Sequence, residues 1–561
     1  MSKAEKNFNL WLKNVSDEIT KNELILVQNN KDEIEDRFGE DIKFGTAGLR
    51  GVMESGNNRI NIYTVRKATQ GLADYLLERN KTPSVAISYD CRKNSKIFAE
   101  EVASVMAGNG VKSYITKELA PTPFLSYLVR SLKTDAGIMI TASHNTAEYN
   151  GYKCYGNDGA QMNEKFASGV YEYIQKVDMF SGIKRMDFSS GISSGMINFA
   201  EENLKENYIN EILKYRSKAV SLSGIKVLYT PLNGTGNKFV RKALKMAGLK
   251  DLSVAKTQES PDENFTTCPY PNPENISAFS DAFKIASSEN FDLILATDPD
   301  ADRLGVCVRD KNEYKLLSGN EIGIILTNYI LERRKDSKTL PKNGVIVKTV
   351  VSTMMADKIA KAYGCEVRNV LTGFKNIAHE IAELESSNRD EDYLFGFEES
   401  NGYLCGGYVR DKDAVSASLI VCEAVSYYKE KFGKNLAEVL AQLYSEYGYF
   451  GEKTLSYNLK EINPRISTVD IMNHFRDDSL GFIGAYRIKN KKDYLKSEGV
   501  MKSDVLEFDL KNVMKIIVRP SGTEPKIKFY IMTKSDSASE REETIKLLAE
   551  TVNKILQNFS D

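Results

Sequence analysis

The chain has 561 residues, a length that usually corresponds to about four domains. Apolar residues make up 42% and charged residues 27%, which is typical of a soluble globular protein. The 76 Lys and Arg residues almost balance the 77 Asp and Glu residues, so the net charge of −1 predicts no nucleic-acid partner and no anionic membrane partner.

Targeting and redox signals favour a cytoplasmic protein. The N-terminus lacks the basic segment and apolar region of a secretory signal, and no apolar run approaches the ~18 residues of a membrane span. The seven cysteines are scattered without a CxxC pair, which fits reduced thiols. The three histidines lie far apart in the sequence, so a His-rich zinc site is not expected.

The first 53 residues combine helical segments with a glycine-rich loop. Residues 1–35 are predicted to be helical, with apolar side chains at helical spacing. In IKFGTAGLRGVM, residues 42–53, three glycines free the backbone to bend around Arg50. A loop of this kind suits a phosphate or a carboxylate, although a plain turn would have the same sequence.

From residue 63 onward, helical and strand patterns alternate. Strand, helix and strand at this spacing are typical of a βαβ sheet. The predicted elements are a helix at 63–79, the strand SVAISYD at 84–90, a helix at about 96–108 and the strand VKSYIT.

A further strand pattern ends abruptly at a serine. The apolar run from Gly137 to Ile140 stops at the small polar residues of TASHN. This predicts a buried strand ending in a tight loop that presents the Ser143 hydroxyl, with the His144 imidazole beside it. Open α/β sheets place their chemistry in such loops. The alternative is that Ser143 is a turn or N-cap residue.

The next segment is predicted to return toward the serine loop. Asn150-Gly151 and Asn157-Asp158-Gly159 are turn signals, so residues 148–162 are expected to form a hairpin that brings Lys153 near Ser143. Residues 184–197 are rich in Gly and Ser and are predicted to end the first domain.

A second α/β unit opens at GIKVLYTPLNGTG and leads to an acidic loop. Phe239 stands where a dinucleotide fingerprint needs its third glycine, so NAD binding is not expected. In DPDADR, Asp298, Asp300 and Asp302 alternate in a short loop after an apolar strand. Such carboxylates can converge on one hard cation, and open coordination positions suit Mg²⁺. Arg303 stands where an EF-hand needs glycine; an acidic surface turn is the alternative.

The third unit carries groups suited to sugars and phosphates. The charged stretch 332–344 is predicted to be a linker, and a strand and helix follow at 344–355. In TGFKNI, Lys375 could meet phosphate or be solvated. In GFEES, Glu398 and Ser400 occupy alternate positions that can hold vicinal sugar hydroxyls, although a solvated acidic hairpin is an alternative.

The last segment, from about 455, contains an anion loop. RPSGTEPK offers the planar fork of an arginine, with hydroxyls and exposed N–H groups for phosphate, although a Pro-Ser-Gly turn is an alternative. A terminal helix is predicted to begin with a capping box of Ser539 and Glu542. The residues of the anion loop are Arg519, Ser521, Gly522 and Thr523.

Together these loops indicate phosphoryl transfer. A serine, a metal loop and cationic groups are the parts that position and neutralise a transferring phosphoryl group. The sequence has no Walker motif and no protein-kinase motif set, which disfavours an ATP-dependent kinase.

In these motifs the chain resembles the α-D-phosphohexomutase superfamily, in its phosphoglucomutase/phosphomannomutase branch, which includes phosphopentomutase-like members. The matching motifs span residues 44–525 in the family's order: FGTAGLRG, TASHN, NGYK, DPDADR, SGNE, TGFK, GFEES and RPSGTEP. Thr146 and Asn233 depart from the family pattern without touching the chemistry. Asn401 departs from it beside the sugar loop, which leaves the choice of sugar open.

The resemblance implies three α/β domains of similar topology and a C-terminal TBP-like α+β domain around a central cleft. The expected domains are 1–205, 206–325, 326–450 and 451–561. It implies a phosphoserine at Ser143, with Mg²⁺ held by that phosphoryl group and the three aspartates. Glu398 and Ser400 match the sugar-recognition loop, and the anion loop matches the site of the non-reacting phosphate. The residues matching positions around the transferring phosphoryl group are Arg50, His144, Lys153, Arg303 and Lys375.

The implied activity is the interconversion of glucose 1-phosphate and glucose 6-phosphate through glucose 1,6-bisphosphate. Mannose, ribose or deoxyribose phosphates are alternative substrates. A metal-dependent sugar phosphatase and a non-catalytic sugar-phosphate sensor are the rival classes, and small-molecule sugar phosphates are the expected partners in each.

Overall fold

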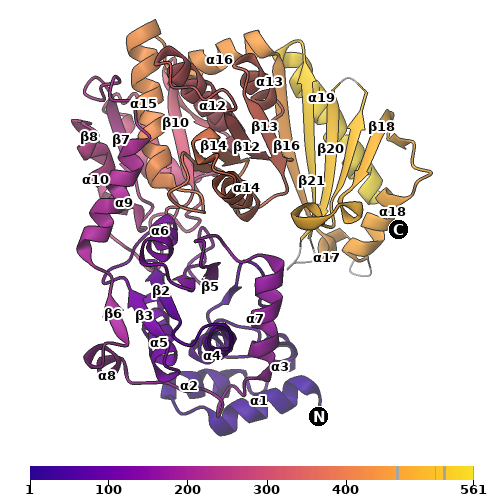
Figure 1. The fold of residues 1–561 in the computed structure, drawn as a ribbon. Coiled ribbons are helices and arrows are strands. Elements are labelled where there is room, and N and C mark those ends of the chain that lie inside the picture. Colours follow the sequence, from indigo (N-terminus) through magenta and orange to yellow (C-terminus); the bar gives the residue numbers. More distant parts are fainter. Residues whose placement is uncertain (463–465, 512, 522–525, 560–561) are drawn as a thin grey trace. The chain divides into compact units, whose positions relative to one another are not determined.

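The computed structural model describes residues 1–462, 466–511, 513–521 and 526–559 (Figure 1). The chain forms two compact units. The first comprises Met1–Ser318 and Ser400–Gly433, and the second comprises Gly319–Glu399 and Lys434–Asp561. Each is described by itself. No helix among the described residues combines the length and apolarity needed to span a membrane.

Three N-terminal helices form a small aromatic cluster in the first unit. They are α1 (Lys3–Asn14), α2 (Glu18–Val27) and α3 (Lys31–Phe38), each begun by a capping side chain. Trp11 is buried, and its ring makes edge contacts with Phe38 at 5.8 Å and Tyr63 at 5.1 Å between centroids. Buried aromatic rings therefore anchor these helices to the rest of the unit.

The first sheet has the strand order β1-β5-β4-β2-β3-β6. Strand β2 pairs in parallel with β3 and β4, and β5 runs antiparallel to β4. All five residues of β4 are buried, which explains its continuous apolar run. The strands are β1 (Leu49–Val52), β2 (Ser84–Tyr89), β3 (Lys112–Ile115), β4 (Ala136–Ile140), β5 (Tyr149–Gly156) and β6 (Ile197–Phe199); the helices are α4 (Ile62–Arg79), α5 (Ser95–Gly108), α6 (Thr122–Leu132), α7 (Glu164–Lys176) and α8 (Phe188–Ser193).

Two predictions for this region were wrong. Asn150-Gly151 is not a turn but lies inside β5, because Asn150 is buried and donates to the Lys93 carbonyl and the Ser95 hydroxyl. Residues 184–197 do not end the domain, since they contain α8 and lead into β6, which pairs with β3.

The second sheet has the order β11-β10-β9-β7-β8, with β7 parallel to β8 and β9. Helix α15 follows the third sheet in sequence but packs on α10 and on β9 and β10, and residues 400–433 group with the first compact unit. The strands of this sheet are β7 (Lys226–Thr230), β8 (Asp251–Val254), β9 (Leu293–Thr297), β10 (Leu304–Asp310) and β11 (Glu313–Leu317); the helices are α9 (Glu202–Lys214), α10 (Gly236–Met246), α11 (Ser280–Ala286) and α15 (Ala414–Phe432). The first unit also contains β15 (Gly402–Leu404), which is not part of this sheet.

The third sheet, in the second unit, places β12 between β13 and β14, with both pairings parallel. The predicted linker 332–344 begins inside α12, and the predicted boundary at 325/326 falls within the same helix. The strands are β12 (Val345–Thr349), β13 (Glu366–Val370) and β14 (Tyr393–Glu398); the helices are α12 (Gly319–Asp336), α13 (Met355–Ala362), α14 (Phe374–Ser386) and α16 (Leu436–Tyr447).

These three sheets share one topology, as the sequence predicted. In each, the first strand of the repeat is central and pairs in parallel with the second and third: β2 with β3 and β4, β7 with β8 and β9, and β12 with β13 and β14. The loop after the third strand carries Ser143 in the first repeat, Asp298 in the second and Ser400 in the third. The chemical groups therefore occupy equivalent places in three copies of one fold.

The fourth sheet is antiparallel and α+β in character, with the order β16-β21-β20-β19-β18-β17 (Figure 1, orange to yellow). The predicted boundary at 450/451 lies within β16. The predicted capping box was wrong, because Ser537 caps α19 by accepting from the Glu540 N–H. The elements are β16 (Tyr449–Asn458), β17 (Phe482–Ile483), β18 (Tyr486–Asp493), β19 (Leu506–Leu510), β20 (Met514–Pro520), β21 (Lys526–Ser535), α17 (Leu459–Ile462), α18 (Thr468–Arg476) and α19 (Ala538–Gln557).

Candidate active site

Ser143 lies in a tight, buried loop just after the end of β4. Its backbone is left-handed, with φ at 54°, and only 3% of its surface is exposed. Its Oγ donates to Oδ2 of Asp298 at 2.9 Å and lies 3.3 Å from Nδ1 of His144. The serine predicted from the first repeat therefore meets the acidic loop predicted from the second.

Asp298, Asp300 and Asp302 form a buried cluster after β9. One oxygen from each carboxylate lies within 4.8 Å of the other two. The loop folds around Asp298, whose Oδ1 accepts from the N–H groups of Asp302 at 3.1 Å and Arg303 at 3.0 Å. Oδ1 of Asp300 and Oδ1 of Asp302 are buried without a hydrogen-bond partner among the described residues. Such oxygens, held together without donors, fit a hard divalent cation.

Two ammonium groups face this cluster. Lys153 Nζ, from β5, lies 2.6 Å from Asp300 and 3.2 Å from Asp302, and Lys412 Nζ lies 2.9 Å from Asp302. Lys153 thus lies beside the serine loop, as the chain order predicted. It is placed there by strand β5, which pairs with β4.

Lysine side chains lower the pKa values of Asp300 and Asp302 but not that of Asp298. Burial raises the pKa of Asp302, but Lys153 and Lys412 outweigh it and leave that pKa below its ordinary value. Burial and Asp302 likewise raise the pKa of Asp300, and Lys153 outweighs them. Asp298 has no ammonium partner among the described residues, so burial and the two other carboxylates raise its pKa well above the ordinary range. A divalent cation would remove this repulsion.

His144 and two arginines surround the serine loop. Burial, then Arg303 and Arg50, lower the pKa of His144 well below 6.5, so its imidazole is neutral at neutral pH. Arg50, on β1, is exposed and donates to Asn145 Oδ1 at 3.1 Å. Arg303 forms an ion pair with Glu274. All of these residues belong to the first unit.

The remaining predicted residues are mostly in the second unit. Lys375 lies in the first turn of α14, and Glu398 is buried at the end of β14. Arg519 lies on β20, and the Ser521 N–H donates to the Lys526 carbonyl at 2.8 Å. Ser400 begins the segment that belongs to the first unit, so the division falls between Glu398 and Ser400. Gly522 and Thr523 lie outside the described residues.

Tyr530, in the second unit, interacts electrostatically with Arg519, and no sequence pattern pointed to it. Its pKa is raised to about 12 by burial and by Glu399, while a hydrogen bond with Arg519 acts in the opposite direction. Tyr530 also belongs to a buried apolar cluster that joins the third sheet to the fourth, through Val350, Leu371 and Ile517.

Three further residues were missed in the first unit. Thr122 donates its hydroxyl to Asp300 at 2.6 Å, and Lys412 approaches Asp302 from a distant part of the chain. Arg92 is buried beneath the serine loop. Arg92 follows the predicted strand 84–90, and this strand-end position was a sequence signal for a site residue. No sequence pattern of this kind surrounds Lys412.

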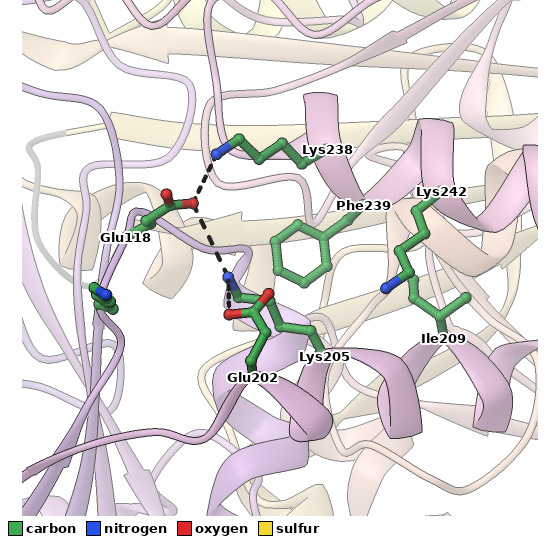
Figure 2. A pocket seen from close by; sticks show the side chains of 8 residues that line it. Glu118, Glu202, Lys205, Ile209, Lys238, Phe239 and Lys242 are labelled. Atoms are coloured by element: carbon green, nitrogen blue, oxygen red, sulfur yellow. Dashed lines mark hydrogen bonds and ion pairs between the residues drawn. The ribbon is translucent and has the colours of Figure 1, made fainter.

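A separate hollow lies between α9, α10 and the loop after β3 (Figure 2). Its volume is about 430 Å³, and Phe239 and Ile209 form its apolar wall. Three of the four lysines that line it have carboxylate partners: Lys238 lies 2.7 Å from Glu118, Lys205 lies 3.0 Å from Glu202, and Lys242 lies 2.9 Å from Glu206. It contains none of the predicted groups, and its exposed ion pairs are of a kind worth little energy. The Ser143 cluster is therefore the candidate site.

Four family models match successive parts of the chain. Their descriptions are phosphoglucomutase/phosphomannomutase alpha/beta/alpha domain I at residues 41–180, domain II at 206–311, domain III at 318–447 and the C-terminal domain at 485–545. Together they include most of the chain, and the first two contain the Ser143 and Asp298 loops.

Curated relatives and solved structures agree with these matches. The chain is 34% identical to a phosphoglucomutase of Staphylococcus aureus (strain MRSA252), covering 94% of this chain and 95% of the relative. It is 35% identical to that of Staphylococcus haemolyticus, covering 90% and 92%. A putative phosphomannomutase from Thermus thermophilus has a TM-score of 0.69 at 22% identity, covering 92% of this chain and 99% of that chain. A Paramecium phosphoglucomutase, parafusin, has a TM-score of 0.67 at 16% identity, covering 92% and 96%.

Proposed function

The chain belongs to the phosphoglucomutase/phosphomannomutase family, and on this premise we propose that it interconverts glucose 1-phosphate and glucose 6-phosphate. The observation that carries the proposal is the 2.9 Å hydrogen bond between the Ser143 hydroxyl and one of three clustered carboxylates. The staphylococcal relatives, at 33–35% identity, bear the name phosphoglucomutase, which favours glucose phosphates.

The carboxylate cluster fits Mg²⁺, held by Asp298, Asp300, Asp302 and a phosphoryl group on Ser143. Bound there, the ion neutralises negative charge on the phosphoserine. Two unpartnered carboxylate oxygens and the elevated pKa of Asp298 support this assignment. An Aspergillus fumigatus N-acetylphosphoglucosamine mutase has been solved with magnesium and a sugar phosphate, at a TM-score of 0.51.

The transfer itself exchanges one phosphorus–oxygen bond for another. The free 6-hydroxyl of glucose 1-phosphate attacks the phosphoserine, the new O6–P bond forms, and the bond to Ser143 Oγ breaks. The 6-hydroxyl proton leaves to a nearby base, and Ser143 Oγ takes up a proton as its bond to phosphorus breaks. The His144 imidazole, neutral and 3.3 Å from Oγ, is suited to accept the 6-hydroxyl proton. Burial lowers the pKa of Lys153, but Asp300 and Asp302 outweigh it and raise that pKa, so Lys153 is an ammonium whose proposed role is to neutralise charge near the transferring group. The product of this half-reaction is glucose 1,6-bisphosphate.

The second half-reaction uses the other end of the bisphosphate. After the sugar turns around, Ser143 Oγ attacks the phosphorus of the 1-phosphate. The Oγ–P bond forms, the O1–P bond breaks, the serine proton passes to the base, O1 takes up a proton, and glucose 6-phosphate is released. Arg50, Arg303 and Lys375 are the cations proposed around the transferring group. A variant of the Aspergillus fumigatus N-acetylphosphoglucosamine mutase, structurally similar to this chain at a TM-score of 0.52, was solved with glucose 1,6-bisphosphate.

Sugar recognition is assigned to the loop of the third repeat, and phosphate recognition to the loop of the fourth sheet. Glu398 and Ser400 hold the sugar hydroxyls. Arg519, Ser521, Gly522 and Thr523 hold the phosphate that does not react.

The test compares Ser143→Ala with Ser113→Ala. Ser113 is also buried, and its hydroxyl has no hydrogen-bond partner among the described residues, so its loss should be neutral. With a sugar bisphosphate present, Ser143→Ala should abolish turnover while thermal unfolding stays close to that of the wild type. Equal turnover by the two variants would remove Ser143 from the mechanism.

Substrate choice is tested separately by kcat/KM on glucose 1-phosphate, mannose 1-phosphate and ribose 1-phosphate. Glucose 1-phosphate should give the highest value. Release of inorganic phosphate without an isomerised sugar would instead identify a phosphatase, and binding without turnover would identify a sensor.

A further inference from the structure

We propose that Arg92 is a positioning residue whose guanidinium fixes the conformation of the Ser143 loop; this inference rests on the proposed function of Ser143. Nη2 donates to the carbonyls of Ser143 at 2.6 Å and Asn145 at 2.5 Å. Nη1 donates to those of Thr146 at 2.7 Å and Tyr149 at 3.1 Å. One side chain just after β2 thus gathers four carbonyls of a loop that lies far from it in the sequence.

Asp90 holds the other side of the same loop. Its Oδ2 lies 3.2 Å from Arg92 Nε and accepts from the Thr141 hydroxyl at 2.6 Å. Thr141 in turn accepts from the Ser143 N–H at 2.8 Å. The Ser143 N–H is therefore held by Asp90 through Thr141, and the Ser143 carbonyl is held directly by Arg92. Both charged side chains have no exposed surface.

The Ser143 conformation requires such a support. A serine with φ at 54° occupies a sparsely populated region, and a residue persists there only where its surroundings over-determine it. The direction of the Ser143 Oγ depends on this backbone conformation, and in it the Oγ points at the Asp298 carboxylate. Releasing the Ser143 carbonyl would let the loop relax and turn the hydroxyl away from the carboxylate cluster.

Lysine cannot replace the guanidinium in this role. Arginine presents five donors in a rigid planar fork, and four of its hydrogen bonds are used here. The ammonium of lysine has three donors around a point. Arg92 also stacks on the Phe265 ring, with Cζ 4.9 Å from the centroid, an interaction that favours the planar group. Because Arg92 is buried beneath the loop, it acts through Ser143 rather than on the substrate.

The test compares Arg92→Lys with Arg37→Lys. Arg37 is a matched control, since it is also buried but forms ion pairs with Glu23 and Glu33 of the N-terminal helices and with Glu54 after β1. For Arg92→Lys we expect kcat to fall about 100-fold, the effect of misplacing a reacting atom by about 1 Å, while KM for glucose 1-phosphate stays within about twofold. Arg37→Lys should lower the Tm and leave kcat unchanged.

A spectroscopic readout separates positioning from general destabilisation. The ³¹P resonance of phosphorylated Arg92→Lys should shift relative to that of the wild type, whereas that of Arg37→Lys should not. If Arg92→Lys does not fold, Thr141→Val removes the hydrogen bond to the Ser143 N–H and should lower kcat about 10-fold with the same KM. Wild-type kcat in a folded Arg92→Lys, or an equal loss in Arg37→Lys, would overturn the inference. A wild type that takes up no phosphate from a bisphosphate would instead refute the proposed function.

Discussion

Gly48 provides a sharp test of the loop that carries Arg50. Its backbone is left-handed, with φ at +77°, and a Cβ added there would lie 1.8 Å from the carbonyl oxygen of Tyr152. An ordinary carbon–oxygen contact is about 3.3 Å, so the loop must move by about 1.5 Å in Gly48→Ala. Arg50 follows two residues later, and Lys153 follows Tyr152. A displacement of this size should lower kcat/KM about 100-fold.

Gly110 is the matched control, because its φ is +78° and nothing lies within 4 Å of an added Cβ. Gly110→Ala should therefore carry only the conformational cost of a left-handed alanine, about 1 kcal/mol, and retain full activity. A coupled assay of glucose 6-phosphate formation, together with thermal unfolding, measures both effects. Equal activities in the two variants would refute the claim that the Gly48 loop positions the cations.

Three further predictions concern metal, pH and the lysine hollow. Removing divalent ions with a chelator should abolish turnover, and Mg²⁺ should restore it in the wild type but not in Asp300→Asn, as activity titrations would show. Burial raises the pKa of Glu452 from 4.5 to about 7. The folded state therefore binds the Glu452 proton more tightly than the unfolded state does. The stabilisation from this proton is fully present below pH 4.5 and is lost as the pH rises through about 7. Above pH 7 the free energy of unfolding of Glu452→Gln, measured by denaturant titration, should be about 3 kcal/mol larger than that of the wild type. Near pH 4.5 this difference should disappear. Lys238→Met breaks only the exposed pair with Glu118, so kcat/KM should stay within about twofold; a larger loss would assign the hollow to the reaction.

The strand-end loops were predictable because their signals are local. Each third strand of a repeat is a continuous buried apolar run, and such a run followed by small polar or acidic residues marks the edge of a parallel sheet. The buried aspartate cluster and the alternation of helices and strands followed from the same patterns.

The failures share the opposite cause, since they depend on contacts between distant segments. Asn150-Gly151 has the composition of a turn, yet Gly151 lies where an added Cβ would be 2.5 Å from the Thr141 carbonyl, and neighbouring strands hold it extended. Lys412 reaches Asp302 only because α15 returns to the first unit. No local sequence pattern predicts that packing. Tertiary contacts therefore determine both the extended conformation of Asn150-Gly151 and the position of Lys412.

The capping error shows how narrow a local signal can be. Ser539 and Glu542 have the spacing of a capping box, but Ser537 and Glu540 have it too, and the helix begins two residues earlier. Helix ends are set by which side chain reaches the first free N–H groups, and neighbouring serines compete for that place.

The most direct measurement of the central claim is the mass of the protein after incubation with glucose 1,6-bisphosphate, followed by protease mapping. One added phosphoryl group should be found on the peptide that contains Ser143, and glucose 1-phosphate should remove it. An unmodified peptide, in a preparation that still interconverts the two glucose phosphates, would contradict the proposal that Ser143 carries the transferred group.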